Sequence, residues 1–162
     1  MKDALLKIKE RLSGGIDYLA TKSADERAVY ITADRTIPRV TDYPAIALKD
    51  GSESYSLSGG TLAPGAAADT YEGEFEKFFT VEVTAFVRLY VEEDLITGNG
   101  DNKGILDLVE DIKALLTGWL PGAAYTMPLV PVESGPSQVF TDEAQTVYIQ
   151  MKTITFSLSR QD

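Results

Sequence analysis

Residues 77–92 read KFFTVEVTAFVRLYVE, and this stretch decides the fold. Every second side chain from Phe79 to Val91 is apolar, which places an apolar row on one face of a β-strand. At about 3.3 Å per residue such a strand would reach roughly 50 Å, so it is expected to bend or to project beyond the core. The second face of this strand carries Phe86 and Tyr90. We expect these aromatic rings to be covered either by the long segment of residues 51–75 or by a neighbouring subunit.

Two helices are predicted, one before this strand in the sequence, over residues 3–12, and one after it, over residues 103–119. Leucine and isoleucine recur at helical spacing in both, joined by valine in the second, so each helix has one apolar stripe to bury against the sheet. Asp3 is expected to cap the first helix, and Asp101 or Asn102 the second, because short polar side chains accept hydrogen bonds from exposed backbone N–H groups. Trp119 ends the apolar stripe and is expected in the core.

The remaining strand candidates are short or irregular. Residues 28–32 and 45–49 are rich in β-forming side chains, while residues 128–137 contain three prolines and predict an edge strand or an extended loop. A last strand is predicted over 146–160, where the apolar positions change parity at 152–153, indicating a bulge or a change of packing partner. The prediction is one α+β domain, residues 1–162, with a largely antiparallel, mixed β-sheet and two main helices packed on one face.

Residues 51–75 are rich in glycine, serine and alanine and show little periodicity. Such a segment predicts a long loop insertion or an extended hairpin, and long insertions in compact domains are often functional. Its larger apolar side chains join others on the long strand as the candidate interface with a subunit or partner: Tyr55, Leu57, Leu62, Tyr71, Phe78, Phe86 and Tyr90.

The composition argues against most catalytic chemistry. The chain has no cysteine and no histidine, which removes disulfides, thiolate ligands, the commonest metal ligand and the commonest general base near neutral pH. No glycine pattern typical of phosphate binding occurs. We therefore expect a protein that is not an enzyme and needs no cofactor. The net charge of −10 disfavours gripping nucleic acid, and it suits either simple solubility or repulsion of a passing polyanion.

Two acidic segments are candidate metal sites, and both favour a plainer interpretation. Residues 99–110 resemble an EF-hand loop, but Asn99 replaces the first aspartate and Lys103 adds a cation among the ligands. A polar helix cap is the better interpretation, so no metal is expected. Glu92, Glu93 and Asp94 follow the long strand, where consecutive carboxylates usually form a solvated turn.

The sequence also bears on where the protein is made. It has no apolar run of about 20 residues that could span a bilayer, and its first residues, MKDALLKIKERL, lack the apolar core of a signal peptide. We expect no membrane contact and synthesis in the cytoplasm of the producing cell.

The order of these elements resembles the tail terminator, or tail completion, family of long-tailed bacteriophages. The resemblance rests on the N-terminal ALLKIKERL helix, the Pro44-Ala45-Ile46 start of a strand, the FFTVEVTAFVRLYV strand, the GILDLVEDIKALLTGW helix and a closing strand that ends at Arg160. These features span nearly the whole chain, and the long segment at 51–75 departs from the most compact version of the pattern.

The resemblance implies a structural virion protein at the head-proximal end of the tail, assembled in the host cytoplasm. Copies would form a ring, with six subunits expected, that caps the tail tube and joins it to head or neck connector proteins. DNA would pass through without specific binding, and Glu92, Glu93 and Asp94 are candidates to face the channel. The alternatives are another phage component, such as a tube subunit or neck adaptor, and an acidic, non-enzymatic binding module.

Overall fold

The computed structural model describes the backbone of residues 1–23, 26–33, 42–61, 72–89, 91–100, 102–141 and 147–161. The helices and strands follow one another along these residues in this order: α1 Lys2–Gly15, β1 Thr21–Ser23, β2 Glu26–Arg27, β3 Val29–Ile31, β4 Ala45–Thr61, β5 Glu72–Leu89, α2 Glu92–Thr97, α3 Ile105–Leu116, β6 Tyr125–Ser134, β7 Gln138–Thr141 and β8 Tyr148–Gln161. None of the described helices is both long enough and apolar enough to cross a membrane.

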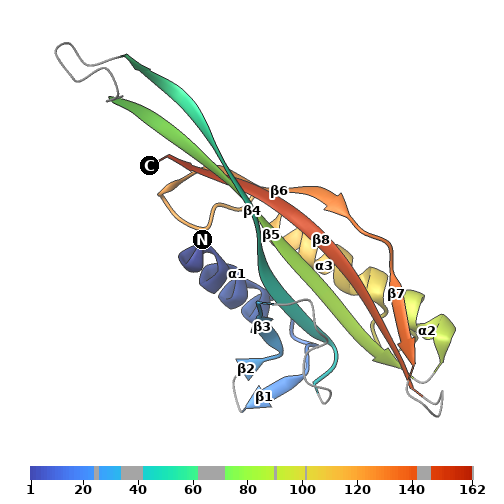
Figure 1. Ribbon diagram of the computed structural model, residues 1–162. Helices are drawn as coiled ribbons and strands as arrows, with labels where there is room; N and C mark the ends of the chain where they lie inside the picture. Colours follow the sequence, from blue (N-terminus) through green and yellow to red (C-terminus); the bar gives the residue numbers. More distant parts are fainter. Residues whose placement is uncertain are drawn as a thin grey trace.

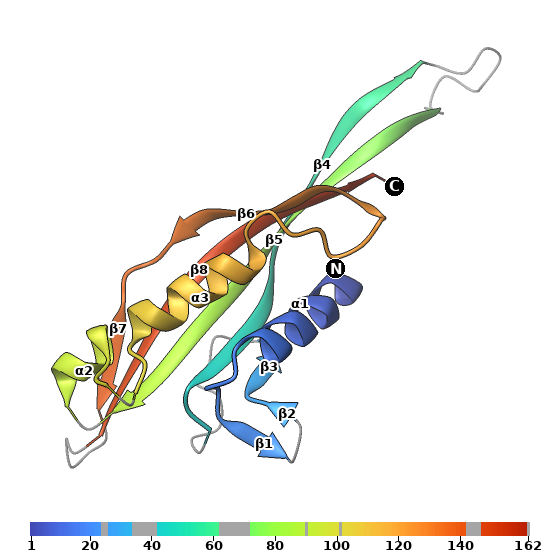
Figure 2. The ribbon, with the colours of Figure 1, turned by 180° about the vertical axis from the view of Figure 1, so that it is seen from behind.

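One mixed sheet organises the molecule. Its strands lie in the order β3-β4-β5-β8-β6, β7 also pairs with β8, and every pairing is antiparallel except that of β3 with β4. The two longer helices, α1 and α3, pack on one face of this sheet (Figures 1 and 2). The predicted α+β class, with a largely antiparallel, mixed sheet and two main helices on one face, is confirmed.

The alternation of β5 places its apolar row in the core as predicted. Phe79, Val81, Val83, Ala85 and Val87 are all buried beneath the helices. The same row was expected to continue to a further valine, residue 91. That side chain is 54% exposed, because the strand ends two residues earlier and the chain turns into α2.

The helix caps differ from the prediction. Asp3 lies in the first turn of α1 and makes no cap bond; its carboxylate lies 3.3 Å from the Lys7 ammonium instead. At α3 the cap is Gly104, whose backbone N–H donates to the Asp107 carboxylate at 3.0 Å. Asn102 is therefore not the cap, because it pairs with the backbone of residue 99. Asp101 lies outside the described residues.

The parity change in β8 marks a change of packing partner. Ile154, Phe156 and Leu158 face the helices, whereas Ile149 and Met151 pack on the opposite face. The pairing of β8 with β5 has no register shift, so the predicted alternative of a bulge there is wrong. Along its other edge, β8 pairs with β6 through residues 154–160 and with β7 through residues 148–151. Position 152–153 is thus where one edge strand gives way to another.

The edge strand predicted over residues 128–137 is present as β6, at the end of the sheet order. Three register shifts interrupt its pairing with β8, in a strand that holds two prolines, Pro128 and Pro131. Proline has no backbone N–H to donate, so irregular pairing at an edge is what these residues permit.

Candidate assembly surfaces

The segment 51–75 forms part of a long hairpin in its described residues. β4 and β5 stay paired out to Thr61 and Glu72, whereas the pairing of β5 with β8 ends at Glu76. The extended-hairpin alternative is therefore right for 51–61 and 72–75, and the loop alternative is wrong there. We call residues 53–61 and 72–77 the arm. Its base, 53–56 with 76–77, still lies beside β8 in the sheet, and its outer part, 57–61 with 72–75, projects beyond the body of the sheet (Figure 1).

The arm carries exposed aromatic rings beside an ion pair. Tyr55 is 62% exposed and Phe75 is 39% exposed. The Lys77 ammonium lies 3.0 Å from the Glu53 carboxylate and 5.2 Å from the centre of the Tyr55 ring. Hydrogen bonding between the charged pair lowers the pKa of Glu53 and raises that of Lys77. Strand pairing places these four side chains on one side of the arm.

The outer edge of β4 has little cover. β3 pairs only with Ile46, Ala47 and Leu48, and among the described residues no strand pairs with that edge of β4 farther along the arm. An open strand edge offers a row of backbone N–H and C=O groups to another chain. The arm therefore has both the side chains and the backbone of a surface suited to pairing.

A bulge lies at the base of the arm, opposite residues of β5 that still pair with β8. The register of β4 against β5 shifts between Asp50 and Glu53. Within this bulge the backbone N–H of Ser52 donates to the Thr80 hydroxyl at 2.8 Å. Gly51 sits so close to Thr80 that an added Cβ would collide with its hydroxyl, so only glycine fits there without a shift. This local packing sets the direction in which the arm departs.

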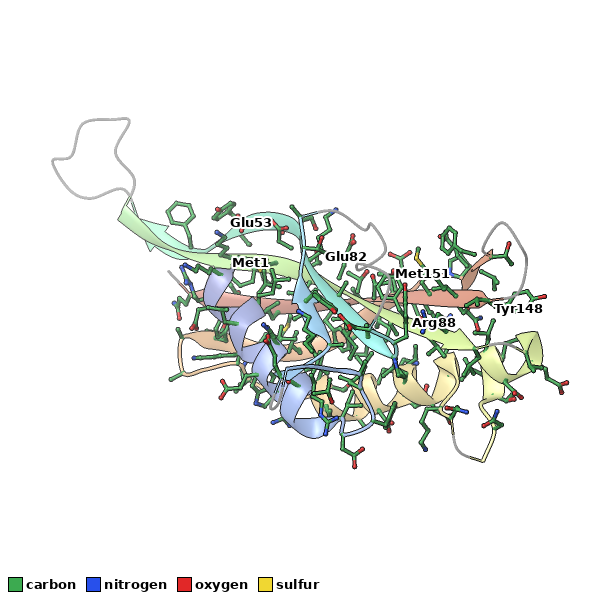
Figure 3. All side chains as sticks on the ribbon, turned by 90° about the horizontal axis from the view of Figure 1, so that it is seen from below. Met1, Glu53, Glu82, Arg88, Tyr148 and Met151 are labelled. Atoms are coloured by element: carbon green, nitrogen blue, oxygen red, sulfur yellow. The ribbon has the colours of Figure 1, made fainter. Side chains whose placement is uncertain are left out.

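The sheet face opposite α1 and α3, which we call the open face, is rich in hydroxyl groups. Thr84 and Thr153 hydrogen-bond across two strands at 2.9 Å, and the Ser159 hydroxyl donates to the Glu76 carboxylate at 2.8 Å. Glu82 lies on the same face, and Figure 3 shows it with Met151 on the side of the sheet away from the helices. A depression of about 460 Å³ lies on this face between the sheet and residues 132–136.

The other predicted interface residues fall into two groups. Phe86 is 1% exposed, because Ala28, Ala45, Ala47, Tyr43 and Met151 pack around it on the open face, so its assignment to an interface is wrong. The partly buried Phe78 lies on the open face near the arm. The predicted interface residues whose side chains lie outside the described set are Leu57, Leu62, Tyr71 and Tyr90.

The acids predicted to face the channel do not lie on the open face where the structure describes them. Glu93 and Asp94 are on α2, which packs through Leu95 into the core on the helix side, and the side chain of Glu92 is outside the described set. Asp94 accepts a hydrogen bond from the Asn99 amide at 2.8 Å. Glu133 of β6 lines the depression on the open face, and the acids that β5 places on this face are Glu76 and Glu82. They could have been found from the alternation of β5, since both have the even parity opposite to the core row.

A groove runs between the second half of α1 and the end of α3. Its volume is about 510 Å³, and it is lined by Lys7, Glu10, Arg11, Gly14, Gly15, Leu115 and Trp119. Trp119 was expected in the core, and it packs against the core while remaining partly exposed in the groove. The sequence carries no signal for this groove, because it depends on how two distant helices approach.

The structure also bears on the EF-hand resemblance. Asp107, within residues 99–110, accepts a hydrogen bond from the backbone N–H of Gly104, the cap residue of α3, and Asn99 pairs with Asn102. Throughout the described ranges, no three acidic side chains gather in a way that could hold a metal ion. Compared with known protein families and with curated protein sequences, the chain matches none.

Proposed function

We propose that this protein is a structural subunit that assembles with copies of itself into a closed ring, as a tail terminator does at the end of a phage tail tube. The observation that carries the proposal is the arm. Two strands extend past the body of the sheet with an open backbone edge, and the arm carries exposed rings at Tyr55, near its base, and at Phe75, past the end of β8. Within one chain this extension leaves apolar rings and backbone groups exposed, and the surface of a neighbouring copy would cover them.

The arrangement of surfaces favours a ring over a two-fold dimer. The arm lies at one end of the molecule, and α2 and β7 lie at the other (Figures 1 and 2). When one part of a subunit contacts a different part of the next, the contact repeats head to tail, and a fixed rotation closes the series into a ring. The number six comes from the family resemblance alone.

In this proposal the open face lines the channel. Its central positions include the hydroxyl groups of Thr80 and Thr155 and the carboxylate of Glu82, whose register partner on β4 is Lys49. The whole chain has a net charge of −10. Binding to DNA phosphates depends on lysine and arginine, so a hydroxyl-rich wall on a strongly acidic subunit would let DNA pass with little adhesion. This assignment replaces the acids of α2 with Glu76 and Glu82.

The proposal gives the chain no catalytic role and no cofactor. Support comes from the absence of histidine and cysteine in the sequence and from the hydroxyl groups of the open face. Those of Ser52, Thr80, Thr84 and Thr153 hydrogen-bond to one another in pairs, an arrangement that suits structure rather than nucleophilic attack.

Mass in solution and electron microscopy of the pure protein test the proposal. Discrete rings of one size, alone or on addition of tail-tube protein, are the expected result, and the tube protein should stop elongating when rings are present. Filaments of unlimited length would favour a tube subunit. Rings that bind connector proteins and leave tube growth unchanged would favour a neck adaptor. A strict monomer in every mixture would favour a binding module and would overturn the ring.

A further inference from the structure

We propose that Asn99 is a site of spontaneous deamidation, at which the asparagine side chain is converted to a carboxylate. The site lies in the connection between α2 and α3, and the inference is independent of the assembly proposed above. Asn99 is followed by Gly100, and both residues are exposed to water. The hydrogen bonds of this connection surround the Asn99 amide with the groups that such a reaction uses.

The reaction needs no partner other than water. The backbone nitrogen of Gly100 attacks the side-chain carbon Cγ of Asn99, so that an N–Cγ bond forms while the Cγ–Nδ2 bond breaks. The proton lost by the Gly100 nitrogen balances the one gained by the departing amine, so ammonia leaves and a cyclic imide remains. Water then opens this ring at either of its two carbonyl carbons. The product is aspartate or isoaspartate, in which the backbone runs through the side chain, and no atom is oxidised or reduced.

Gly100 provides an unhindered nucleophile. A Cβ added at this position would meet nothing within 4 Å apart from its neighbours in the chain, so its backbone lies in open space. Among the described residues, the Gly100 N–H makes no backbone hydrogen bond that would have to break first. The attack is also intramolecular, and two reacting groups held in one chain react far more readily than two separate molecules.

Two N–H groups of Asn102 donate to the side-chain oxygen of Asn99. The backbone N–H and the side-chain Nδ2 of Asn102 each lie 3.1 Å from Asn99 Oδ1, and the backbone group also lies 3.1 Å from the Asn99 carbonyl oxygen. Negative charge develops on Oδ1 when Cγ is attacked. Donors that already point at such an oxygen stabilise the transition state, as they do in the oxyanion hole of an enzyme. The two hydrogen bonds therefore favour attack at this amide.

The carboxylate of Asp94 lies beside the amine that departs. Asn99 Nδ2 donates to this carboxylate at 2.8 Å, which fixes the orientation of the amide. The same segment ends α2, because the Gly98 N–H donates to the Asp94 carbonyl at 2.8 Å. After deamidation an acceptor stands where the donor was, and two carboxylates face each other. Like charges so close repel, so the reaction replaces an attraction with a repulsion at the end of α2.

Incubation of the folded protein at mildly alkaline pH, followed by peptide mass spectrometry, tests the proposal. Asn99 and Asn102 are the two asparagines of the chain, so Asn102, which is followed by the bulky Lys103, is an internal control. Asn99 is expected to react severalfold faster than Asn102. It should also react severalfold faster than the same asparagine in a synthetic peptide of residues 95–103, which lacks the fixed hydrogen bonds.

Two variants test the nucleophile and the donors separately. Gly100→Ala adds a methyl group that enters open space, so the fold should be kept while the crowded ring closure slows severalfold. Asn102→Ala removes the Nδ2 donor and keeps the backbone N–H. It should slow the reaction severalfold, which is less than the roughly 10²–10³-fold effect of one such donor in a closed active site, because this connection is exposed to water. Circular dichroism establishes that each variant is folded.

The direction of the Asn102→Ala effect decides between two roles for the hydrogen bonds. Slower reaction of Asn99 in this variant supports the proposal, because the lost donor then served the transition state. Faster reaction would mean that the hydrogen bonds hold the amide away from attack, and it would overturn the proposal. Reaction of Asn99 in the folded protein that is slower than in the peptide, or no faster than that of Asn102, would overturn it as well.

Discussion

At the scale of single residues, Tyr18 joins the connection after α1 to α3. Its hydroxyl donates to the Asp111 carboxylate at 2.5 Å. Burial of the ring, followed by that hydrogen bond, raises the pKa of Tyr18 well above its ordinary value of about 10. The protonated hydroxyl is thus part of the folded state and supports the approach of the two helices that form the groove.

Replacing Tyr18 with phenylalanine tests this contact. Loss of a hydrogen bond to a charged acceptor is expected to lower the free energy of unfolding by about 1–2 kcal/mol at neutral pH. Because the pKa of Tyr18 is higher in the folded chain, the unfolded chain loses its proton first once the pH passes about 10, and wild-type stability falls from there. Urea unfolding from pH 7 to 11 should therefore show a shallower alkaline decline for Tyr18→Phe. An unchanged slope would contradict the assignment.

Tyr55→Phe serves as the control for that comparison. Tyr55 is largely exposed on the arm, and its hydroxyl lies 3.5 Å from the Glu53 carboxylate. Exposed substitutions usually change stability by less than about 0.5 kcal/mol, so this variant should unfold like the wild type at neutral pH.

Residue patterns predicted burial well and exposure poorly. The core row of β5 followed from alternation alone, because a sheet with helices on one face must bury one parity. Phe86 has the other parity and was therefore assigned to an interface. The sequence could not show that Ala45, Ala47 and Tyr43 pack around Phe86, since that cover depends on contacts between distant segments.

At the scale of elements, the arm can be removed without cutting into the core. Deletion of residues 55–71 takes away the part of β4 that lies past the body and leaves its buried residues, such as Ile46 and Leu48, in place. The helical and strand signals in circular dichroism should persist, while ring formation in sedimentation is lost. An unfolded deletion variant would mean that the arm supports the core and does not serve assembly alone.

The elements themselves were predictable to different degrees. α3 and β5 were clear because a long apolar stripe or row outweighs weak local preferences. For the arm, the sequence is compatible with both a loop and a hairpin. Gly59 and Gly60 interrupt the alternation of its side chains, and the strand is held by its pairing with β5. The caps of α1 and α3 were missed because glycine and methionine give no polar signal for an N-terminus.

At the scale of the whole molecule, the net charge of −10 predicts how the assembly treats DNA. Neither the protein nor its ring should retard double-stranded DNA in a gel-shift experiment near physiological ionic strength, because few phosphates would be neutralised. Replacing Glu76 and Glu82 with lysine should produce retardation that weakens as salt is added. Failure of this variant to bind DNA, while still forming rings, would argue against the open face as the channel wall.

The continuity of β5 from the arm into the core has a mechanical consequence. Its fourteen register partners along β8, from Glu76↔Gln161 to Leu89↔Tyr148, run without a shift and parallel to the arm. A pull applied at the tip would load these hydrogen bonds in shear, all at once, instead of peeling them apart singly. The molecule is therefore built to bear tension along the direction in which the arm extends.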